Sequence, residues 1–356
     1  MDIFLVYSMM VDTTREALMA SPVSGKLEYR VYSDLPAIAH LSRQWDNLLA
    51  ASRCNKAFGS LEWYIASCRI SSPLAPYLVT ATCGPEITCI LPLVFNPAGR
   101  VAMFPHYAND YNDVLVRGDD LGQVAGLLKY AVSPQTACCR LILSKLRPDS
   151  DCLRAAVCLQ GGPYIDYQYN DVEACFYTEL PSDFDDYLTS LGRKFRKNVR
   201  RALRATEGNS LAVRELYPES LSPIKLPDTF IRLFLDRHNN GKGLFQSAVA
   251  QSFVREVLPP MFYKRSLRVF AMFEERRIIA MVLFFVAARG LLVWNGGFLA
   301  GKEHLSPGTS LYAFAIRQAI AEGIHEFDFG DGDEAYKQHW TNSEYRVGKL
   351  ELVSKM

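Results

Sequence analysis

Short apolar runs alternate along the first half of the chain with segments whose apolar residues recur at helical spacing. Leu41, Trp45 and Leu48 fall three or four residues apart, which is typical of one helix face. The nearly continuous apolar run at 87–95 follows a Gly84-Pro85 turn and favours a buried strand. The pattern predicts strands at 27–32, 77–82, 87–95 and 140–144, a short strand ending at Phe104, and helices from 35, at 60–70, at 121–132 and near 152–158.

The second half repeats this order of elements. A glycine- and proline-containing stretch at 160–170 is interpreted as the crossover between the halves. The pattern then predicts strands at 175–180, 267–273, 278–287, 291–298, 326–329 and 347–353, with helices at 193–206, 227–237, 248–258 and about 306–323. Strands mixed with helices in this order indicate two mixed α/β sheets. We expect an N-terminal domain at 27–160 and a C-terminal domain at 175–356.

Charge and cysteine content narrow the classes of function. The 39 basic and 38 acidic side chains give a net charge of +1, so no global field draws the chain to DNA. No apolar stretch approaches the ~20 residues of a membrane span. Nine cysteines without a C-x-x-C pair argue against a zinc site and against a disulfide framework. These features predict a metal-free protein of a reducing compartment, the cytoplasm.

The segment before the last long helix carries the residues of an anion-binding loop. Ser306 and Pro307 have the form of an N-cap and a first helical residue. Gly308 allows close approach of the backbone, while Thr309 and Ser310 add hydroxyls. Because a helix N-terminus offers unpaired N–H groups and partial positive charge, this loop is a candidate site for a pyrophosphate. An ordinary capped helix start is the alternative.

A second candidate segment follows the predicted strand at 326–329, where acids and glycines form a loop. Ligands tend to bind at the carboxyl ends of strands in α/β sheets. Tyr336 is a candidate proton donor to a leaving thiolate, and Lys337 a candidate partner for a phosphate or carboxylate. A tight turn with satisfied carboxylates is the alternative.

The predicted helix at 193–206 is strongly basic. Its apolar residues share one face, whereas the opposite arc carries Arg193, Lys194, Lys197, Arg200, Arg201 and Arg204. These cations repel one another unless an anionic partner binds. The arc is interpreted either as a solvated face or as a dock for phosphopantetheine, an acidic carrier protein or a tRNA backbone.

Two polar side chains are candidates for a general base. His238 follows a helix, within the segment Asp236–Gly241, and is either a base for an amine or a histidine that faces the helix dipole. Asp110 belongs to a polar cluster at 109–113 and either orients a cationic substrate or serves a turn.

Three pieces of the second half together resemble a known family. They are Gly192-Arg193-Lys194-Phe195 with Arg200-Arg201, the helix opening Leu305-Ser306-Pro307-Gly308, and Phe327-Asp328-Phe329 followed by Gly332-Asp333-Glu334, Tyr336-Lys337 and Trp340. In this order they resemble the GNAT proteins of the cellulose-biosynthesis (CelD-type) acetyltransferase group, which is similar to the Fem-type peptidoglycan aminoacyltransferases. The first half agrees more loosely, through Trp45, Phe58, Trp63 and Asp110-Tyr111.

This resemblance implies two tandem GNAT-like domains and N-acyl transfer to an amine, without a covalent enzyme intermediate. Ser306–Ser310 would hold the donor's pyrophosphate, and the strands at 291–298 and 326–329 would hold its pantetheine arm. Backbone N–H groups near Trp294 and Asn295 would polarise the thioester carbonyl.

The donor and the acceptor remain open at this point. The loop is Ser-Pro-Gly-Thr, whereas GNAT loops are usually richer in glycine, so the donor is either acyl-CoA or an acyl-phosphopantetheine on a carrier protein. The acceptor amine belongs to a small molecule, a sugar or a peptide. A tRNA-dependent aminoacyltransferase and a non-catalytic GNAT-like binding module are the alternatives.

Overall fold

A computed structural model describes residues 26–53, 57–105, 107–159, 165–206, 208, 210–238 and 243–354. This part of the chain divides into two compact units. Unit 1 runs to Glu173 and takes in the C-terminal segment from Arg346, whereas unit 2 spans Ala174–Tyr345. The expected C-terminal domain at 175–356 therefore differs from unit 2 at its end, because the last strand pairs with a strand of unit 1.

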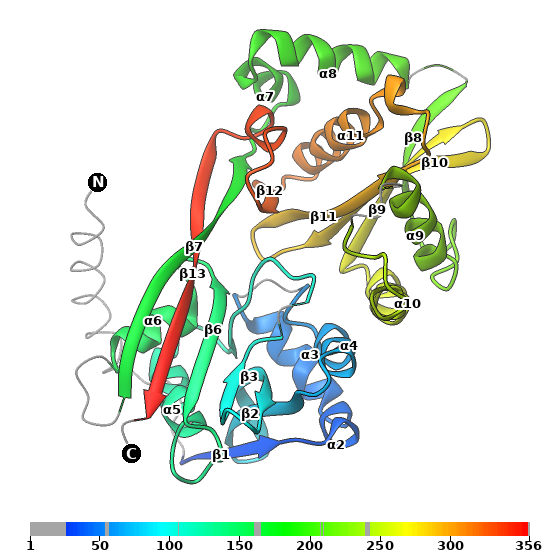
Figure 1. Cartoon of the computed structure of the whole chain (residues 1–356). Coiled ribbons are helices and arrows are strands. Elements are labelled where there is room, and N and C mark those ends of the chain that lie inside the picture. The colour runs from blue at the N-terminus through cyan, green and yellow to red at the C-terminus, as the bar shows by residue number, and fades with distance from the viewer. Residues whose placement is uncertain are drawn as a thin grey trace. The chain divides into compact units, whose positions relative to one another are not determined.

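Unit 1 is a mixed sheet with helices on both faces (Figure 1). Its strand order is β1-β2-β3-β4-β6-β13, with β5 paired to β3. The strands are β1 (Leu27–Tyr32), β2 (Ala75–Cys83), β3 (Glu86–Asn96), β4 (Val101–Met103), β5 (Leu115–Val116), β6 (Arg140–Leu146) and β13 (Ser343–Ser354). The helices are α2 (Leu35–Ala39), α3 (Ser42–Ala51), α4 (Leu61–Ile70), α5 (Leu121–Ala131) and α6 (Asp151–Val157).

Unit 2 has the strand order β7-β12-β11-β10-β9-β8. The strands are the part of β7 (Ile165–Glu179) from Ala174 on, then β8 (Leu211–Leu216), β9 (Leu267–Glu274), β10 (Arg277–Val286), β11 (Gly290–Phe298) and β12 (Glu326–Asp331). The helices are α7 (Phe184–Ser190), α8 (Arg193–Ala205), α9 (Leu226–Arg237), α10 (Ala248–Tyr263) and α11 (Pro307–Ala321), with single 3₁₀ turns at Glu303–Leu305 and Lys337–His339.

The two units share one topology. In unit 1, β1 to β4 are antiparallel neighbours and β6 joins β4 in parallel after the helix α5. In unit 2, β8 to β11 are antiparallel and β12 joins β11 in parallel after α11. An antiparallel strand, β13 or β7, then follows the fifth strand in each unit. The predicted mixed α/β fold is confirmed, although the strands belong to one large mixed sheet rather than to two separate sheets.

Alternation along the strands gives each sheet two apolar faces. In β10, Val282 and Phe284 pack into the core that contains α7, α8 and α11, while Phe285 packs with Trp294 on the side of α9. The faces of the unit 1 sheet are covered in the same way, one by α5 and α6 and the other by α2, α3 and α4. Successive side chains of a strand point to opposite faces, so strands buried on both faces read as continuous apolar runs.

Helix caps and the segment between the two halves agree only in part with what the local sequence indicates. Ser60 caps α4 and accepts a hydrogen bond from Trp63 N at 3.3 Å. The cap of α7 is Asp183, whose carboxylate accepts from Asp185 N and Asp186 N. Of the expected crossover, 160–164 lie outside the described residues, and the remainder belongs to the long strand β7. The strand β8 was missed.

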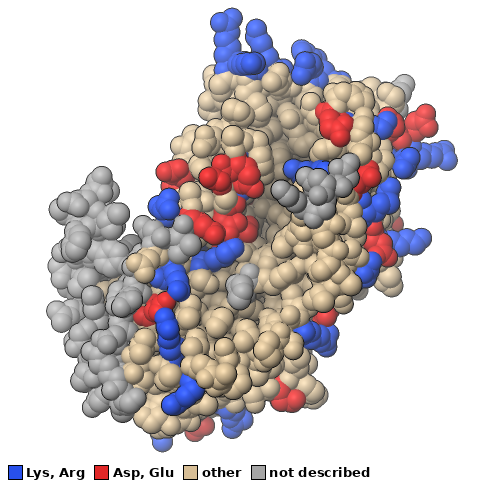
Figure 2. Space-filling model, viewed as in Figure 1, with Lys and Arg blue, Asp and Glu red and all other residues tan. Residues whose placement is uncertain are grey.

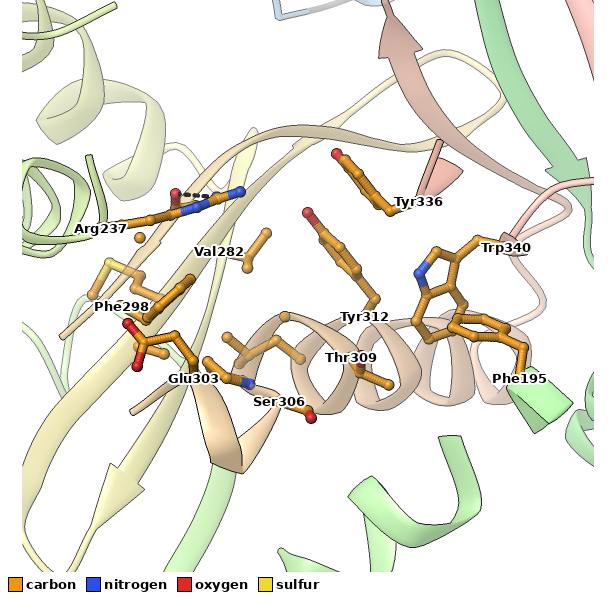
Figure 3. A pocket seen from close by; sticks show the side chains of 17 residues that line it. Phe195, Arg237, Val282, Phe298, Glu303, Ser306, Thr309, Tyr312, Tyr336 and Trp340 are labelled. Atoms are coloured by element: carbon orange, nitrogen blue, oxygen red, sulfur yellow. Dashed lines mark hydrogen bonds between the residues drawn. The ribbon is translucent and has the colours of Figure 1, made fainter. Parts of the chain in front are cut away.

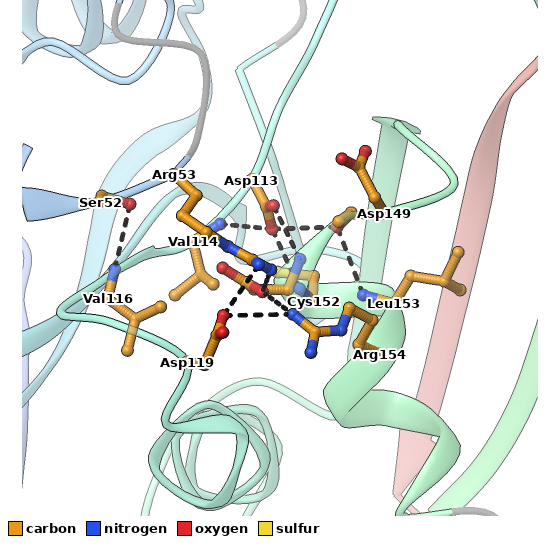
Figure 4. A network of polar contacts seen from close by, with 12 residues as sticks. Ser52, Arg53, Asp113, Val114, Val116, Asp119, Asp149, Cys152, Leu153 and Arg154 are labelled. Carbon is orange, nitrogen blue, oxygen red and sulfur yellow. Dashed lines mark hydrogen bonds and ion pairs between the residues drawn. The ribbon is translucent and has the colours of Figure 1, made fainter. Parts of the chain in front are cut away.

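A buried carboxylate fixes α6 within unit 1 (Figure 4). Asp113 accepts hydrogen bonds from Asp151 N at 2.8 Å, Cys152 N at 3.0 Å and Ser150 Oγ at 3.0 Å. Arg53 and Arg154 in turn bind the Asp151 carboxylate at 2.8 and 2.9 Å. Burial, together with the charge of Asp151, raises the pKa of Asp113 to about 6.

Within the part of the chain that the structure describes, no helix has the length and apolarity needed to cross a membrane.

Candidate functional site

A cavity of about 390 Å³ opens in unit 2 beside the start of α11 (Figure 3). Its walls come from α11, β10, β11, the end of α9 and the loop after β12, and are mostly apolar. Aromatic and charged side chains on this wall include Phe195, Arg237, Phe298, Glu303, Tyr312 and Tyr336. Of the predicted site residues, the structure brings Ser306, Pro307, Gly308, Thr309 and Tyr336 together on this cavity.

The start of α11 differs from the expected capped helix. Ser306 precedes the helix but adopts a left-handed conformation, with φ 50° and ψ 52°, and its side chain makes no capping hydrogen bond. Ser60 and Ser247, by contrast, cap their helices. Ser310 N is the first α11 amide to bond back, to Ser306 O at 3.1 Å.

The amides of Gly308 and Thr309 therefore have no acceptor among the described residues, although both residues line the cavity. Such orphan N–H groups at a helix N-terminus are the usual site for a phosphate oxygen.

The strands beside the cavity separate along their length. β11 and β12 pair in parallel at Gly290–Leu292 with Glu326–Asp328, and no pairing between them continues beyond Leu292 in the described chain. The register of β11 with β10 skips one residue at Trp294, where Leu283 faces Asn295 and Phe284 faces Val293. A bulge of this kind bends its strand and interrupts the hydrogen-bond ladder locally. Gly296, Gly297 and Phe298, just past the bulge, line the cavity.

Two tyrosines face the cavity with nearly parallel rings. Tyr312 of α11 and Tyr336 of the loop after β12 have ring centroids 6.2 Å apart and an interplanar angle of 5°. Burial raises the pKa of Tyr336 well above its usual value, and the neighbouring Tyr312 phenol raises it further. Although 38% of Tyr336 is exposed, its hydroxyl is desolvated by these neighbours, so it is a neutral hydrogen-bond donor at physiological pH.

The sequence analysis did not single out Arg237 and Glu303, the charged side chains of the cavity wall. Arg237 Nη1 donates to Gly296 O at 2.9 Å, and its guanidinium lies 5.6 Å from the ring centroid of Phe298. Glu303 belongs to the 3₁₀ turn before α11 and accepts from Gly301 N at 3.2 Å. No periodic or motif signal marks either residue, because the fold alone brings α9 beside this turn.

Ser310 and Lys337 were expected to contact the donor with their side chains, but neither residue lines the cavity. Ser310 is buried and its hydroxyl donates to Ala202 O at 3.5 Å. Lys337 is also buried, with its ammonium bonded to the carbonyls of Asp331 and Gly332 and paired with Glu334 at 2.9 Å. It thus holds the loop that carries Tyr336.

The strand position proposed to polarise the carbonyl lies next to the cavity and not on its wall. The Trp294 ring packs against Phe230 on the opposite face of the sheet, and Asn295 is half-buried. The bulge of β11 lies at these two residues. That their backbone N–H groups polarise the thioester carbonyl stays a prediction.

The two candidate bases are also placed outside the cavity wall. His238 stacks on Phe234 with ring centroids 4.3 Å apart, and its Nδ1 hydrogen-bonds Phe234 O at 2.9 Å, as a histidine at a helix C-terminus does. Its neighbours Asn239, Asn240 and Gly241 lie outside the described residues. Asp110 is half-buried in unit 1.

The basic helix α8 has the predicted faces. Val199, Ala202 and Leu203 are buried, and all six cations of the opposite arc are exposed at one end of unit 2 (Figure 2). Within the described residues the ion pair of this arc is Arg200 with Asp185 at 3.7 Å, between side chains that are 49% and 84% exposed.

No group of three or more histidine, cysteine, aspartate or glutamate side chains that would hold a metal ion occurs in the described residues.

Comparisons with known proteins agree with this geometry. Residues 193–338 match the acetyltransferase (GNAT) domain family, a range that contains α8, the uncapped start of α11 and the loop with Tyr336. No curated protein matches the sequence.

Solved structures show the fold of the whole chain. FemX superposes with a TM-score of 0.61 at 12% identity, covering 87% of this chain and 95% of that one. L-PGS from Bacillus licheniformis gives a TM-score of 0.57 at 10% identity, covering 87% and 90%. The CelD-type group is not singled out by these comparisons and stays a prediction. Residues 193–338 carry a GNAT acetyltransferase domain, the chain has a Fem-like fold, and the protein is a transferase.

Proposed function

We propose that unit 2 transfers an acyl group from an acyl-thioester, either acyl-CoA or acyl-phosphopantetheine, to an amine. The observation that carries this proposal is the start of α11, where the N–H groups of Gly308 and Thr309 have no acceptor among the described residues and both residues line the cavity. A donor phosphate would accept both, with Ser306 and Thr309 hydroxyls beside it. The pantetheine arm would then run between β11 and β12, where their pairing has ended.

In this proposal the amine attacks the thioester carbonyl carbon directly and the C–S bond breaks. Backbone N–H groups at the β11 bulge, near Trp294 and Asn295, polarise the carbonyl oxygen. Tyr336, on the cavity wall, donates a hydrogen bond to the departing thiolate and is the candidate for its protonation, although burial raises the pKa of this phenol and makes it a weaker acid. The proton of the attacking amine goes to a base, for which His238, in the same unit, stays the candidate. A thioester donor and the free cysteines of the described chain fit a reducing, cytoplasmic compartment.

A thermal-shift measurement with acetyl-, octanoyl- and palmitoyl-CoA tests donor binding. A ligand at 100 times its Kd that binds only the folded state adds about 2.7 kcal/mol of stability. Gly308→Asp places a carboxylate in the phosphate position, while an acid in a first helical turn is itself favourable. A Cβ at Gly308 meets no atom within 4 Å, so the variant should fold.

Gly192→Asp is the matched control, because Gly192 precedes α8 and is equally unobstructed. We expect acyl-CoA to stabilise the wild type and Gly192→Asp, but not Gly308→Asp. Absence of any shift, or an undiminished response in Gly308→Asp, would contradict the CoA proposal.

The exposed cations of α8 and the FemX-like fold favour a second candidate, aminoacyl transfer from tRNA. Lys197 and Arg201 are exposed, without ion pairs in the described structure. Their double replacement by Gln should weaken binding of total tRNA and reduce the slope of log Kd against log salt by about 2, one for each phosphate contact. Arg232→Gln, on the exposed face of α9, is the control. An unchanged slope in the double variant would leave α8 as a solvated face.

A further inference from the structure

Arg237 is the cation of the cavity wall. It ends α9, and its guanidinium is fixed from two sides, by the hydrogen bond to Gly296 O and by the ring of Phe298. A guanidinium has five N–H donors in a planar fork, and Gly296 takes one of them. Among the described residues no carboxylate lies within ion-pair distance of it. Its remaining donors are thus available on the wall of the cavity.

The Tyr312 hydroxyl lies on the same side of the cavity as this guanidinium (Figure 3). The Tyr312 ring is fixed by α11 and by Trp340, with ring centroids 5.9 Å apart, and the residue is only 9% exposed. The charge of Arg237 acts on the hydroxyls of both Tyr312 and Tyr336. Three elements far apart in sequence therefore bring N–H and O–H donors together at one place.

We propose that Arg237 and Tyr312 bind a carboxylate, and that this carboxylate belongs to the acceptor, so that the amine acylated by this protein is that of an amino acid or of a related amino carboxylate. The inference rests on the proposed N-acyl transfer and specifies its acceptor class. Arg forms paired hydrogen bonds with a carboxylate in a geometry that Lys does not reproduce.

The charges of the cavity favour a carboxylate over a phosphate at this place. Arg237 is its cation, and Glu303 also lines the wall, so a dianion would be poorly compensated. The donor phosphate already has the amides of Gly308 and Thr309. An amino acid carries one carboxylate and one amine, and Glu303 gives the ammonium form of that amine a partner before it loses its proton.

A binding measurement tests the site without turnover. N-acetyl amino acids, the products of acetyl transfer, are compared in thermal shift with the corresponding N-acetyl amino acid amides, which lack only the charge. We expect at least one N-acetyl amino acid to bind the wild type about 10-fold or more tightly than its amide, since hydrogen bonds to a charged group are the stronger ones. No preference for any acid over its amide would overturn the carboxylate site.

Matched variants show whether Arg237 causes this preference. Arg237→Met keeps the length of the side chain and removes its donors, and Arg237→Lys keeps only the charge. We expect Arg237→Met to bind acid and amide alike and Arg237→Lys to recover part of the difference. Arg232→Met, five residues earlier on the exposed face of α9, should keep the wild-type preference. A preference that survives in Arg237→Met would refute the proposal, provided that both variants melt like the wild type.

Turnover distinguishes the acceptor from the donor as the source of the carboxylate. Thiol release from acetyl-CoA is measured with free amino acids, their amides and the matching amines, and then from succinyl-CoA against butyryl-CoA with one amine. A kcat/KM that falls about 10-fold or more from acid to amide, in an Arg237-dependent way, supports the acceptor. An Arg237-dependent preference for succinyl-CoA would overturn that assignment. Failure of acyl-CoA to bind at all, with the acid preference intact, would remove only the proposed CoA donor.

Discussion

The ion pairs of Arg268 link three elements that support the cavity of unit 2. From β9, Arg268 Nε and Nη2 each donate to the Glu215 carboxylate of β8 at 2.7 Å, and Nη1 donates to Glu322 at the end of α11 at 2.6 Å. The Arg268 and Glu215 side chains are only 12% and 7% exposed, whereas Glu322 is 40% exposed. Although burial alone lowers it, the hydrogen bonds to both carboxylates raise the pKa of Arg268. The guanidinium therefore stays charged.

Arg268→Met leaves the buried Glu215 carboxylate without its cation and with the Tyr217 hydroxyl, at 3.0 Å, as its remaining hydrogen-bond donor among the described side chains. Removing one member of a buried pair costs about 3–5 kcal/mol, mainly because the other charge remains desolvated. Glu322 contributes little to this cost since it regains water. For a domain of this size, 1 kcal/mol corresponds to about 2–4 °C in Tm, so we expect a decrease of roughly 6–20 °C. Combining Arg268→Met with Glu215→Leu removes both charges and should recover most of the loss.

Urea unfolding and calorimetry measure the effect, with Arg255→Met as control. Arg255 pairs with Asp228 at 2.8 Å, but the two side chains are 49% and 68% exposed, so this pair should contribute about 1 kcal/mol or less. Two results would refute the reasoning: Arg268→Met no more destabilising than Arg255→Met, or a double variant no more stable than Arg268→Met.

Three further predictions concern local geometry. Gly297→Ala should cost about 1–3 kcal/mol by urea unfolding, because its Cβ would lie 2.4 Å from the backbone of α9 at Phe234. Gly308→Ala, whose Cβ meets nothing within 4 Å in the first turn of α11, should not destabilise the protein. Ser60→Ala should lower the free energy of unfolding by about 1 kcal/mol, because it removes the cap of α4. Ser306→Gly should not lower it measurably, because Ser306 makes no capping hydrogen bond and its positive φ suits glycine. Equal losses in the two variants would contradict the left-handed start of α11. The raised pKa of Asp113 means that the folded protein binds the Asp113 proton more tightly than the unfolded chain does. The Tm of the wild type, relative to that of Asp113→Asn, should therefore fall as pH rises from about 4 to 6. A relative Tm that rises over this range would contradict a raised pKa for Asp113.

The sequence alone determined most of the elements and their duplicated order, although it missed β8 and the length of β7. Continuous apolar runs such as 87–95 and 278–287 specify strands buried on both faces, and helical spacing with local caps such as Ser60 specifies helices, because these signals act over a few residues. The same local reasoning located α11, its preceding loop and Tyr336, all of which meet at the cavity. It also gave the two faces of α8.

Tertiary structure decided what depends on residues distant in the chain. Pairing of β13 with β6 gave the last strand to unit 1, which hydrophobic periodicity cannot show because strand partners leave no local pattern. Arg237 reaches the cavity because α9 packs beside β11, and Lys337 is withdrawn from it because its ammonium bonds the carbonyls of its own loop. The uncapped amides of Gly308 and Thr309 result from the left-handed Ser306, a backbone state that the Ser-Pro-Gly sequence permits and that only the surrounding packing selects.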